Sequence, residues 1–434
     1  MKSFYRFVVF VAQVFLGVGF FGMTLSSLPV FANGEESNNI RTALETWTYA
    51  NWQTPVSDSL LNPGNRIANL PKTQETVEAR LDMRFSAETT DVVLRSRMFG
   101  QCNQDEIGTQ SFSEAYLSQG FARMKLSQES TLTAGRELLT WGPANFRSPS
   151  NPFYFDAGRT QPLLDVSGID LARMHYTDGS FGVTGGYVVD AGHLTGAPDY
   201  SHIAFLKCDY RGNDYLVSAI SSQQKNQAPF FGGFAQLTLD EAILLYGELG
   251  SGQRPSNLQV SATSFGAPFE LQQPSPRELT SLLGGSYTFI NGQVVSLEYL
   301  HDGHGYSLEE EHRYFERVRE AGLPLNTSLI SSPAISRSLG TLNLAISQAP
   351  SLLGRDYVSI IWQSNPQEGT LYWRLMSAGN VHDYSSQTSL YVEKNISPRI
   401  SLFALVTVNA GHADSEYGAL LSSMVTMGAK FFVF

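Results

Sequence analysis

The stretch TVEARLDMRF, residues 76–85, decides the fold of this chain. Apolar residues from Val77 to Phe85 alternate with charged residues from Glu78 to Arg84, so a β-strand here has one apolar face and one ionised face. Such a strand can place its apolar face against lipid when the other face meets water inside a closed barrel, because lipid cannot satisfy an open sheet edge. The stretch therefore predicts an all-β fold, a transmembrane antiparallel β-barrel.

Strand-like segments recur along the rest of the chain, and we count about 18 of them between Leu44 and Phe434. The connections between them alternate in length. Short turns such as 88–90 and 291–292 alternate with the long connections 54–74, 141–167, 251–278 and 302–354. Short periplasmic turns and long extracellular loops are typical of bacterial outer-membrane barrels.

The longest connection, 302–354, contains a helix signal near 308–321. Ser307 and Glu310 form a capping box, and Gly322 with Pro324 ends the helix. Within the same connection, Thr341 to Gln348 alternates like a strand. A nineteenth strand would break the even number of strands, so we place this segment inside the long extracellular loop.

Residues 1–32 are typical of a secretory signal peptide, with Lys2 and Arg6 before an apolar core. The alternative is a retained membrane anchor. The barrel then comprises residues 33–434, and removal of the two cations changes the net charge from -11 to -13. An acidic exported chain argues against a nucleic-acid partner and favours the outer membrane and its lipid.

The last residues, Lys430 to Phe434, end in an aromatic residue. This end is similar to the terminal signal by which the barrel-assembly machinery recognises outer-membrane proteins. The pattern leaves open which face of the last strand meets lipid, since Phe432 and Phe434 lie on one face and Phe431 and Val433 on the other.

Basic residues gather on the expected lumenal face of three neighbouring strands. The candidate pore-lining, anion-contacting residues are Arg80, Arg84, Arg95, Arg97, Arg123 and Lys125, opposed by Glu78 and Asp82. Rings of Arg or Lys select anions because they replace part of the hydration of a passing charge. The alternative is that these charges pair across strands and keep the interior wet.

A second group of candidates lies in the connection 141–167. Its members are Arg147, Phe153, Tyr154, Asp156 and Arg159, and a loop of this kind can fold inward as a constriction or contact a sugar. An outer loop stabilised by its own aromatic cluster is the alternative.

Catalytic signals are sparse. His301, Asp302 and His304 lie in a Gly-rich turn, but no third metal ligand is placed by spacing, and neither a GxSxG nor an HExxH motif occurs. We therefore predict no enzyme, no catalytic residue, no metal and no cofactor. The alternative is a hydrolase of the barrel rim that uses His301 or His304.

Short motifs carry a resemblance to a known group. The segments Ala134-Gly135-Arg136-Glu137 and Trp141-Gly142-Pro143, with the later Glu298-Tyr299, resemble the alginate-export and phosphate-selective porins. The resemblance implies a barrel of about 18 strands that passes a small or polymeric hydrophilic solute, with anions favoured. Glu137 departs from the neutral polar residue familiar at that position, which leaves the solute open.

A weaker likeness concerns the segment 141–143 together with Ser150-Asn151-Pro152, which is similar to the capsule-assembly surface lectin barrels. It implies the alternative function, a surface polysaccharide-binding or structural barrel with a closed lumen.

Overall fold

The computed structural model describes residues 39–105, 108–153, 161–193, 200–261, 267–326, 332–367 and 369–434. The predicted signal peptide, residues 1–32, lies outside the described residues, as do Tyr154, Asp156 and Arg159.

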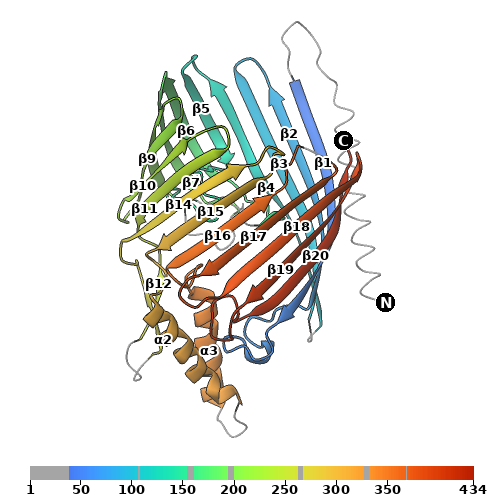
Figure 1. Ribbon diagram of the computed structural model, residues 1–434, viewed down its shortest axis with the longest axis vertical. Helices are drawn as coiled ribbons and strands as arrows, with labels where there is room; N and C mark the ends of the chain where they lie inside the picture. Colours follow the sequence, from blue (N-terminus) through green and yellow to red (C-terminus); the bar gives the residue numbers. More distant parts are fainter. Residues whose placement is uncertain are drawn as a thin grey trace.

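The described residues form a closed antiparallel barrel of 18 strands, which confirms the predicted fold class (Figure 1). Alternating sequences like that of residues 76–85 form these strands, since each places alternate side chains on opposite faces. In chain order they are β1 (Asn39–Pro55), β2 (Thr73–Ser86), β3 (Thr90–Gln104), β4 (Thr109–Lys125), β5 (Ser130–Glu137), β6 (Ile169–Asp178), β7 (Phe181–Asp190), β8 (Ile203–Arg211), β9 (Tyr215–Gln224), β10 (Phe230–Thr238), β11 (Ile243–Gly252), β14 (Glu278–Thr288), β15 (Val294–Asp302), β16 (Asp356–Gln363), β17 (Leu371–Asn380), β18 (Ser386–Ser397), β19 (Ile400–Ala410) and β20 (Leu421–Phe432).

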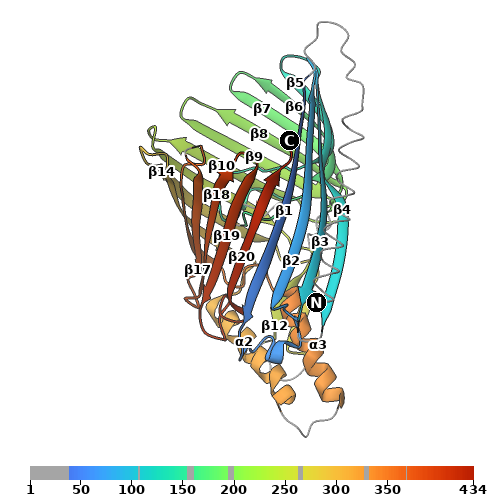
Figure 2. The same cartoon turned by 90° about the vertical axis from the view of Figure 1, so that its right-hand side faces the viewer.

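Each barrel strand pairs with the next one along the chain, and β1 closes the barrel against β20. At this seam Trp47 lies opposite Lys430 of β20 on one side and Glu78 of β2 on the other. Closure leaves no unpaired sheet edge, which is the condition for a sheet in lipid. The short turns lie at the end that holds the C-terminus, and the helices lie at the opposite end (Figures 1 and 2).

The outer surface of the barrel is apolar. Leu94 and Met98 of β3 and Leu283 of β14 are exposed on it, as expected for residues that contact lipid. In β20, Met427 and Phe431 share this exposed face, whereas Lys430 is buried inside the barrel. The outward face of the last strand is therefore the one that carries Phe431. No helix among the described residues is long and apolar enough to cross a membrane.

At the end with the long connections, helices and a small hairpin form a separate apolar cluster, which we call the outer cap. It consists of β12 (Asn257–Val260) with β13 (Phe269–Gln272), α2 (Leu308–Gly322), the short 3-10 helix η2 (Leu323–Asn326) and α3 (Ser332–Gln348), while η1 (Pro63–Asn65) lies in the β1–β2 connection. Leu258, Phe269, Tyr314 and Leu342 are buried together in it.

The capping box operates at the start of α2. The Ser307 side chain accepts a hydrogen bond from the Glu310 backbone amide, and the Glu310 side chain accepts one from the Ser307 amide. The segment Thr341–Gln348 lies in the long connection, as placed, but it is part of α3 and not extended. Ser338, Leu342 and Ala345 are its buried residues, and this spacing is helical.

Candidate functional site

The described parts of the connection between β5 and β6, residues 138–153 and 161–168, enter the barrel, and we call them the inward loop. At Gly142 the backbone has φ +85, and a Cβ there would lie 2.4 Å from Glu248 Oε1 on β11. Glycine is therefore required for this close approach. Beyond it, Phe146 is buried in an apolar cluster with Leu300 of β15 and Tyr357 of β16. The loop thus reaches the wall opposite its own strands.

Glu248 is the first of two buried carboxylates that hold the inward loop. Its side chain is 1% exposed. It accepts hydrogen bonds from the Ala144 amide at 2.7 Å and from the Ser148 and Ser150 hydroxyls, each at 2.7 Å. A buried carboxylate is tolerated when its lone pairs are satisfied in this way.

Glu298 of β15 is the second anchor, and it is 2% exposed. It accepts hydrogen bonds from the backbone amides of Asn145 at 2.6 Å and Phe146 at 2.7 Å, and from the Tyr246 hydroxyl at 2.6 Å. The two glutamates therefore bind consecutive amides of one short segment and set its position against the far wall.

The last part of the inward loop returns along β2, β3 and β4. Arg80 donates to the Leu163 carbonyl at 3.2 Å, and Asp165 lies 3.1 Å from Arg97. Ser167 donates to a carbonyl of β4 at 3.1 Å. Polar contacts thus fix the loop on two opposite walls, so it crosses the lumen.

The predicted pore-lining arginines lie on one wall, and each has a carboxylate partner. Cross-strand register places Arg80 opposite Arg97 and Asp82 opposite Arg95. The ion pairs are Arg80 with Glu78 at 2.8 Å, Arg84 with Asp91 at 3.2 Å, Arg95 with Asp82 at 3.5 Å, Arg97 with Asp82 at 2.6 Å and with Asp165 at 3.1 Å, and Arg123 with Glu137 at 2.8 Å. The wall is thus a charge network and not a row of bare cations.

The arginines of this wall fall into two groups by the exposed fraction of their side chains. The side chain of Arg97 is 4% exposed beneath the inward loop, whereas those of Arg84, Arg95 and Arg123 are 55%, 42% and 38% exposed. Lys125 is exposed as well. The three half-exposed arginines can therefore contact a solute, whereas Arg97 holds the inward loop against the wall.

Glu137 has two cationic partners. It pairs with Arg123 and, at 2.6 Å, with Arg173 of β6. One carboxylate shared by two guanidinium groups leaves one positive charge in excess. The residue that departs from the resembled porins therefore belongs to the lumenal charge network.

Arg80 also takes part in the barrel seam. Its guanidinium carbon lies 3.5 Å from the centre of the Trp47 ring, and Lys430 Nζ lies 4.2 Å from the same ring. Lys430 in turn pairs with Glu393 at 2.7 Å. The indole is thus held between two cations across β1, β2 and β20, an arrangement favoured by cation–π attraction.

The other predicted loop residues have structural surroundings. Arg147 lies 5.9 Å from the Phe146 ring. Phe153 is fully buried against Trp141 and Phe205, which fixes the loop to β8. Its ring is therefore covered and is not presented to a solute in the lumen.

The histidines of the 301–304 turn are also engaged structurally. His301 lies 2.8 Å from Asp356, and Asp302 pairs with Arg254 at 2.7 Å. Among the residues that the structure describes, no group of three His, Cys, Asp or Glu side chains is arranged to hold a metal ion. The turn thus connects the barrel wall to the cap.

The sequence carries a signal for both glutamate anchors of the inward loop, but not for Asp165. Glu298 falls on the lumenal face of its strand by parity. Glu248 has the same signal, an acidic residue among apolar and small ones in a predicted strand. Asp165 lies outside any strand, and no periodicity points to it.

The solved structures that share this fold include OccD3, OccK11 and OccK7. The porin OccD3 of Pseudomonas aeruginosa matches with a TM-score of 0.51 and 11% sequence identity, and the match covers 95% of this chain and 98% of OccD3. OccK11 of the same organism matches with a TM-score of 0.50 and 11% identity, over 91% of this chain and 96% of OccK11. OccK7, also of this organism, matches with a TM-score of 0.50 and 9% identity, over 91% of this chain and 99% of OccK7. No protein-family model matches the chain, and the search of curated proteins found no match.

The closed barrel and its apolar exterior are those of a transmembrane β-barrel, and the structural neighbours show that its fold is of the porin type. The porin-like part of the predicted resemblance is confirmed at the level of the fold. The narrower resemblance to the alginate-export and phosphate-selective porins stays a prediction.

Proposed function

We propose that this protein is an outer-membrane channel for passive passage of a small or polymeric hydrophilic solute, with anions favoured. The observation that carries the proposal is the set of half-exposed arginines, Arg84, Arg95 and Arg123, on the lumenal wall. Guanidinium groups in such a position offset the dehydration of an anion as it passes.

The inward loop supplies the second part of the proposal, a size limit. Because Glu248 and Glu298 hold it on one wall and Arg97 holds it on the other, it reduces the cross-section next to the exposed arginines. A solute would therefore meet the constriction and the cations at the same depth.

The ion pairs limit the expected selectivity. Asp82 and Asp91 neutralise most of the charge of Arg95 and Arg84, whereas Glu137 is shared between Arg123 and Arg173. We therefore expect a modest preference for anions, concentrated near Arg123, and not strict exclusion of cations.

Reversal potentials under a salt gradient test this proposal in planar bilayers. The double variant Arg95→Ala with Arg123→Ala should shift the wild-type anion preference toward cations. Arg337→Ala is the matched control, because it removes one cation from an exposed position on α3, away from the lumen. A double variant with the wild-type reversal potential would refute the role given to these arginines.

The apolar packing of Phe146 inside the barrel favours a second candidate function. If the inward loop closes the lumen, the protein is a surface polysaccharide-binding or structural barrel. That function predicts normal assembly without conductance, and glycan binding that is lost when the loop is altered. Measurable solute flux into liposomes would exclude it.

A further inference from the structure

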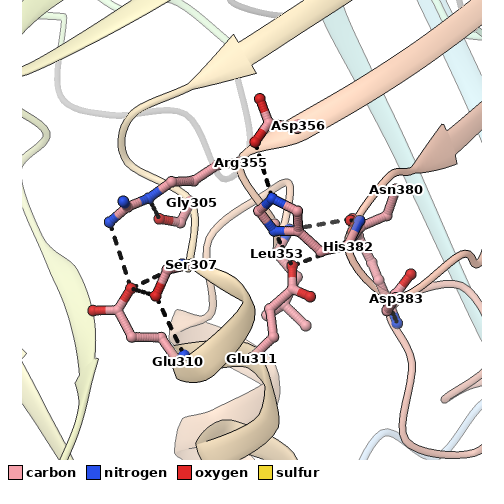
Figure 3. A network of polar contacts seen from close by, with 12 residues as sticks. Gly305, Ser307, Glu310, Glu311, Leu353, Arg355, Asp356, Asn380, His382 and Asp383 are labelled. Carbon is pink, nitrogen blue, oxygen red and sulfur yellow. Dashed lines mark hydrogen bonds and ion pairs between the residues drawn. The ribbon is translucent and has the colours of Figure 1, made fainter.

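A second network of acidic side chains lies where the outer cap meets the barrel rim (Figure 3). Glu311 projects from α2 toward the rim, and Glu416 lies in the β19–β20 connection. The Asn380 side-chain amide donates to Glu311 Oε1 and to Glu416 Oε2, each at 3.0 Å. One amide group therefore joins the cap to two separate parts of the barrel rim.

Glu416 is tied into the rim by further contacts. The Tyr357 hydroxyl donates to its Oε2, and the Leu353 amide donates to its Oε1 at 3.2 Å. Its own backbone amide donates to Asp383 at 2.7 Å. Glu416 thus has little freedom to turn toward water.

Two more carboxylates and two imidazoles complete the network. Asp356 lies 2.9 Å from His382 Nε2 and 2.8 Å from His301 Nδ1. His382 Nδ1 lies 3.8 Å from Glu311 Oε1. Both imidazoles therefore lie closer to Asp356 than to Glu311, and among the described residues no Lys or Arg side chain forms an ion pair with Glu311.

The nearest guanidinium group is occupied on the other side of the α2 N-terminus. Arg355 contacts Glu310 at 3.4 Å and donates to the Gly305 carbonyl at 3.0 Å (Figure 3). Within the described part of the chain, Glu311 Oε2 has no hydrogen-bond partner. For a buried carboxylate without such partners, binding a proton costs less free energy than keeping the charge.

Protonation of both glutamates fits their surroundings. Burial, together with the nearby Asp383 and Glu416, raises the pKa of Glu311 to about 8, against the Asn380 hydrogen bond. Burial with Asp383 raises the pKa of Glu416 to about 7. In water the ordinary carboxyl value applies, so the docked cap holds more protons than a released one across the interval between these values.

We propose that the outer cap is a pH-dependent gate, docked on the barrel rim while Glu311 and Glu416 carry protons and released when they ionise. Docking is complete below the ordinary carboxyl pKa and is lost as the pH rises through the raised values. For each glutamate, the docking equilibrium constant falls by up to about tenfold per pH unit between the ordinary carboxyl pKa and the raised pKa.

Three groups near this contact act in the opposite direction. Against the effect of burial, hydrogen bonds lower the pKa values of Glu310 and Asp356, so these two carboxyls oppose docking only below the ordinary carboxyl range. His304, in the turn before α2, is buried next to Arg254, and burial with this cation lowers its pKa to about 4. Its protonation therefore opposes docking as the pH falls below the ordinary histidine range. Above the carboxyl range, a single imidazole acts against the two carboxyls with raised pKa values, so the net effect of rising pH is release.

Hydrogen–deuterium exchange of α2 in the full-length barrel, from pH 5.5 to 9 and corrected for intrinsic exchange, tests docking directly. In the wild-type protein, exchange should rise at least tenfold across this range. The double variant Glu311→Gln with Glu416→Gln imitates the protonated state and should keep low exchange throughout. Glu309→Gln is the matched control on α2, since Glu309 is exposed and its ion pair among the described residues is with Arg313 of the same helix.

Two results would overturn the docking claim: α2 exchange in the wild-type protein that does not change with pH, or a double variant with the wild-type pH dependence. Heat-modifiable migration verifies that each variant forms the barrel.

The effect on conductance rests on the proposed channel function. Wild-type conductance should rise with the same midpoint as exchange, and the double variant should not show this rise. Conductance that stays constant while exchange rises would overturn the gating role, whereas absence of conductance at every pH would instead count against the channel itself.

Discussion

Replacement of Glu298 by alanine should free the inward loop without unfolding the barrel. The substitution removes four hydrogen bonds. Three come from the loop, from the backbone and side-chain amides of Asn145 and from the Phe146 amide, and one comes from the Tyr246 hydroxyl of the wall. Hydrogen bonds to an ionised group contribute about 1.5 kcal/mol each at the lower end of their range. We use this lower value because water enters the space left by the side chain and satisfies part of the freed donors. The three bonds from the loop thus account for a loss of about 4.5 kcal/mol, or a factor of about 2,000 in the docking of the segment.

Single-channel recording measures this change. If the loop narrows the lumen, Glu298→Ala should raise the open-channel current and add rapid fluctuations as the segment moves. Glu298→Gln should have a smaller effect, because it retains an acceptor oxygen for one of the amides. Glu241→Ala, in the exposed β10–β11 turn, is the control for loss of a carboxylate.

Two measurements decide the outcome. Amide exchange in residues 141–153 should increase in the alanine variant, while the strands stay protected. Increased exchange together with wild-type current would show that the loop does not limit passage. Unchanged exchange would show that Glu298 does not anchor it, and the energetic reasoning would fail.

Two further substitutions probe the same structure. Arg97→Ala leaves Asp165 and part of Asp82 without a cation beneath the loop, and it should lower the free energy of unfolding by about 3 kcal/mol, as measured by urea titration in lipid vesicles. Retained stability would mean that water replaces Arg97 at no cost. Gly142→Ala places a methyl group 2.4 Å from Glu248, at a backbone φ of +85 that disfavours alanine. It should therefore release the loop and reproduce the current fluctuations of Glu298→Ala. A channel current without these fluctuations would contradict the prediction.

Alternation of side chains was sufficient to predict the barrel because it reports directly on the two environments that each strand separates. It failed for Thr341–Gln348, where Leu342 is compatible with both an extended and a helical pattern. Packing against α2 decides the outcome there, and that contact is not visible in the local sequence. The hairpin of β12 and β13 was missed because each strand has only four residues.

The candidate site was predictable only in part. Parity placed Arg95 and Arg123 on the lumenal face, but it could not show that Asp165 comes back from a distant loop to pair with Arg97. Likewise Glu298 was recognisable as lumenal, whereas its partners lie about 150 residues earlier in the chain. Such contacts depend on the path of the loop through the barrel, and the spacing of residues in the sequence does not indicate that path.

The seam between β1 and β20 has a consequence for biogenesis. Trp47 receives one cation from the neighbouring N-terminal strand and the other, Lys430, from the last strand to be synthesised. Until Lys430 arrives, β1 has an unpaired edge and a ring with an empty face, so a stalled or shortened chain would be exposed to periplasmic proteases. Weakening this stack should therefore lower the yield of assembled protein more than the durability of barrels that have already closed.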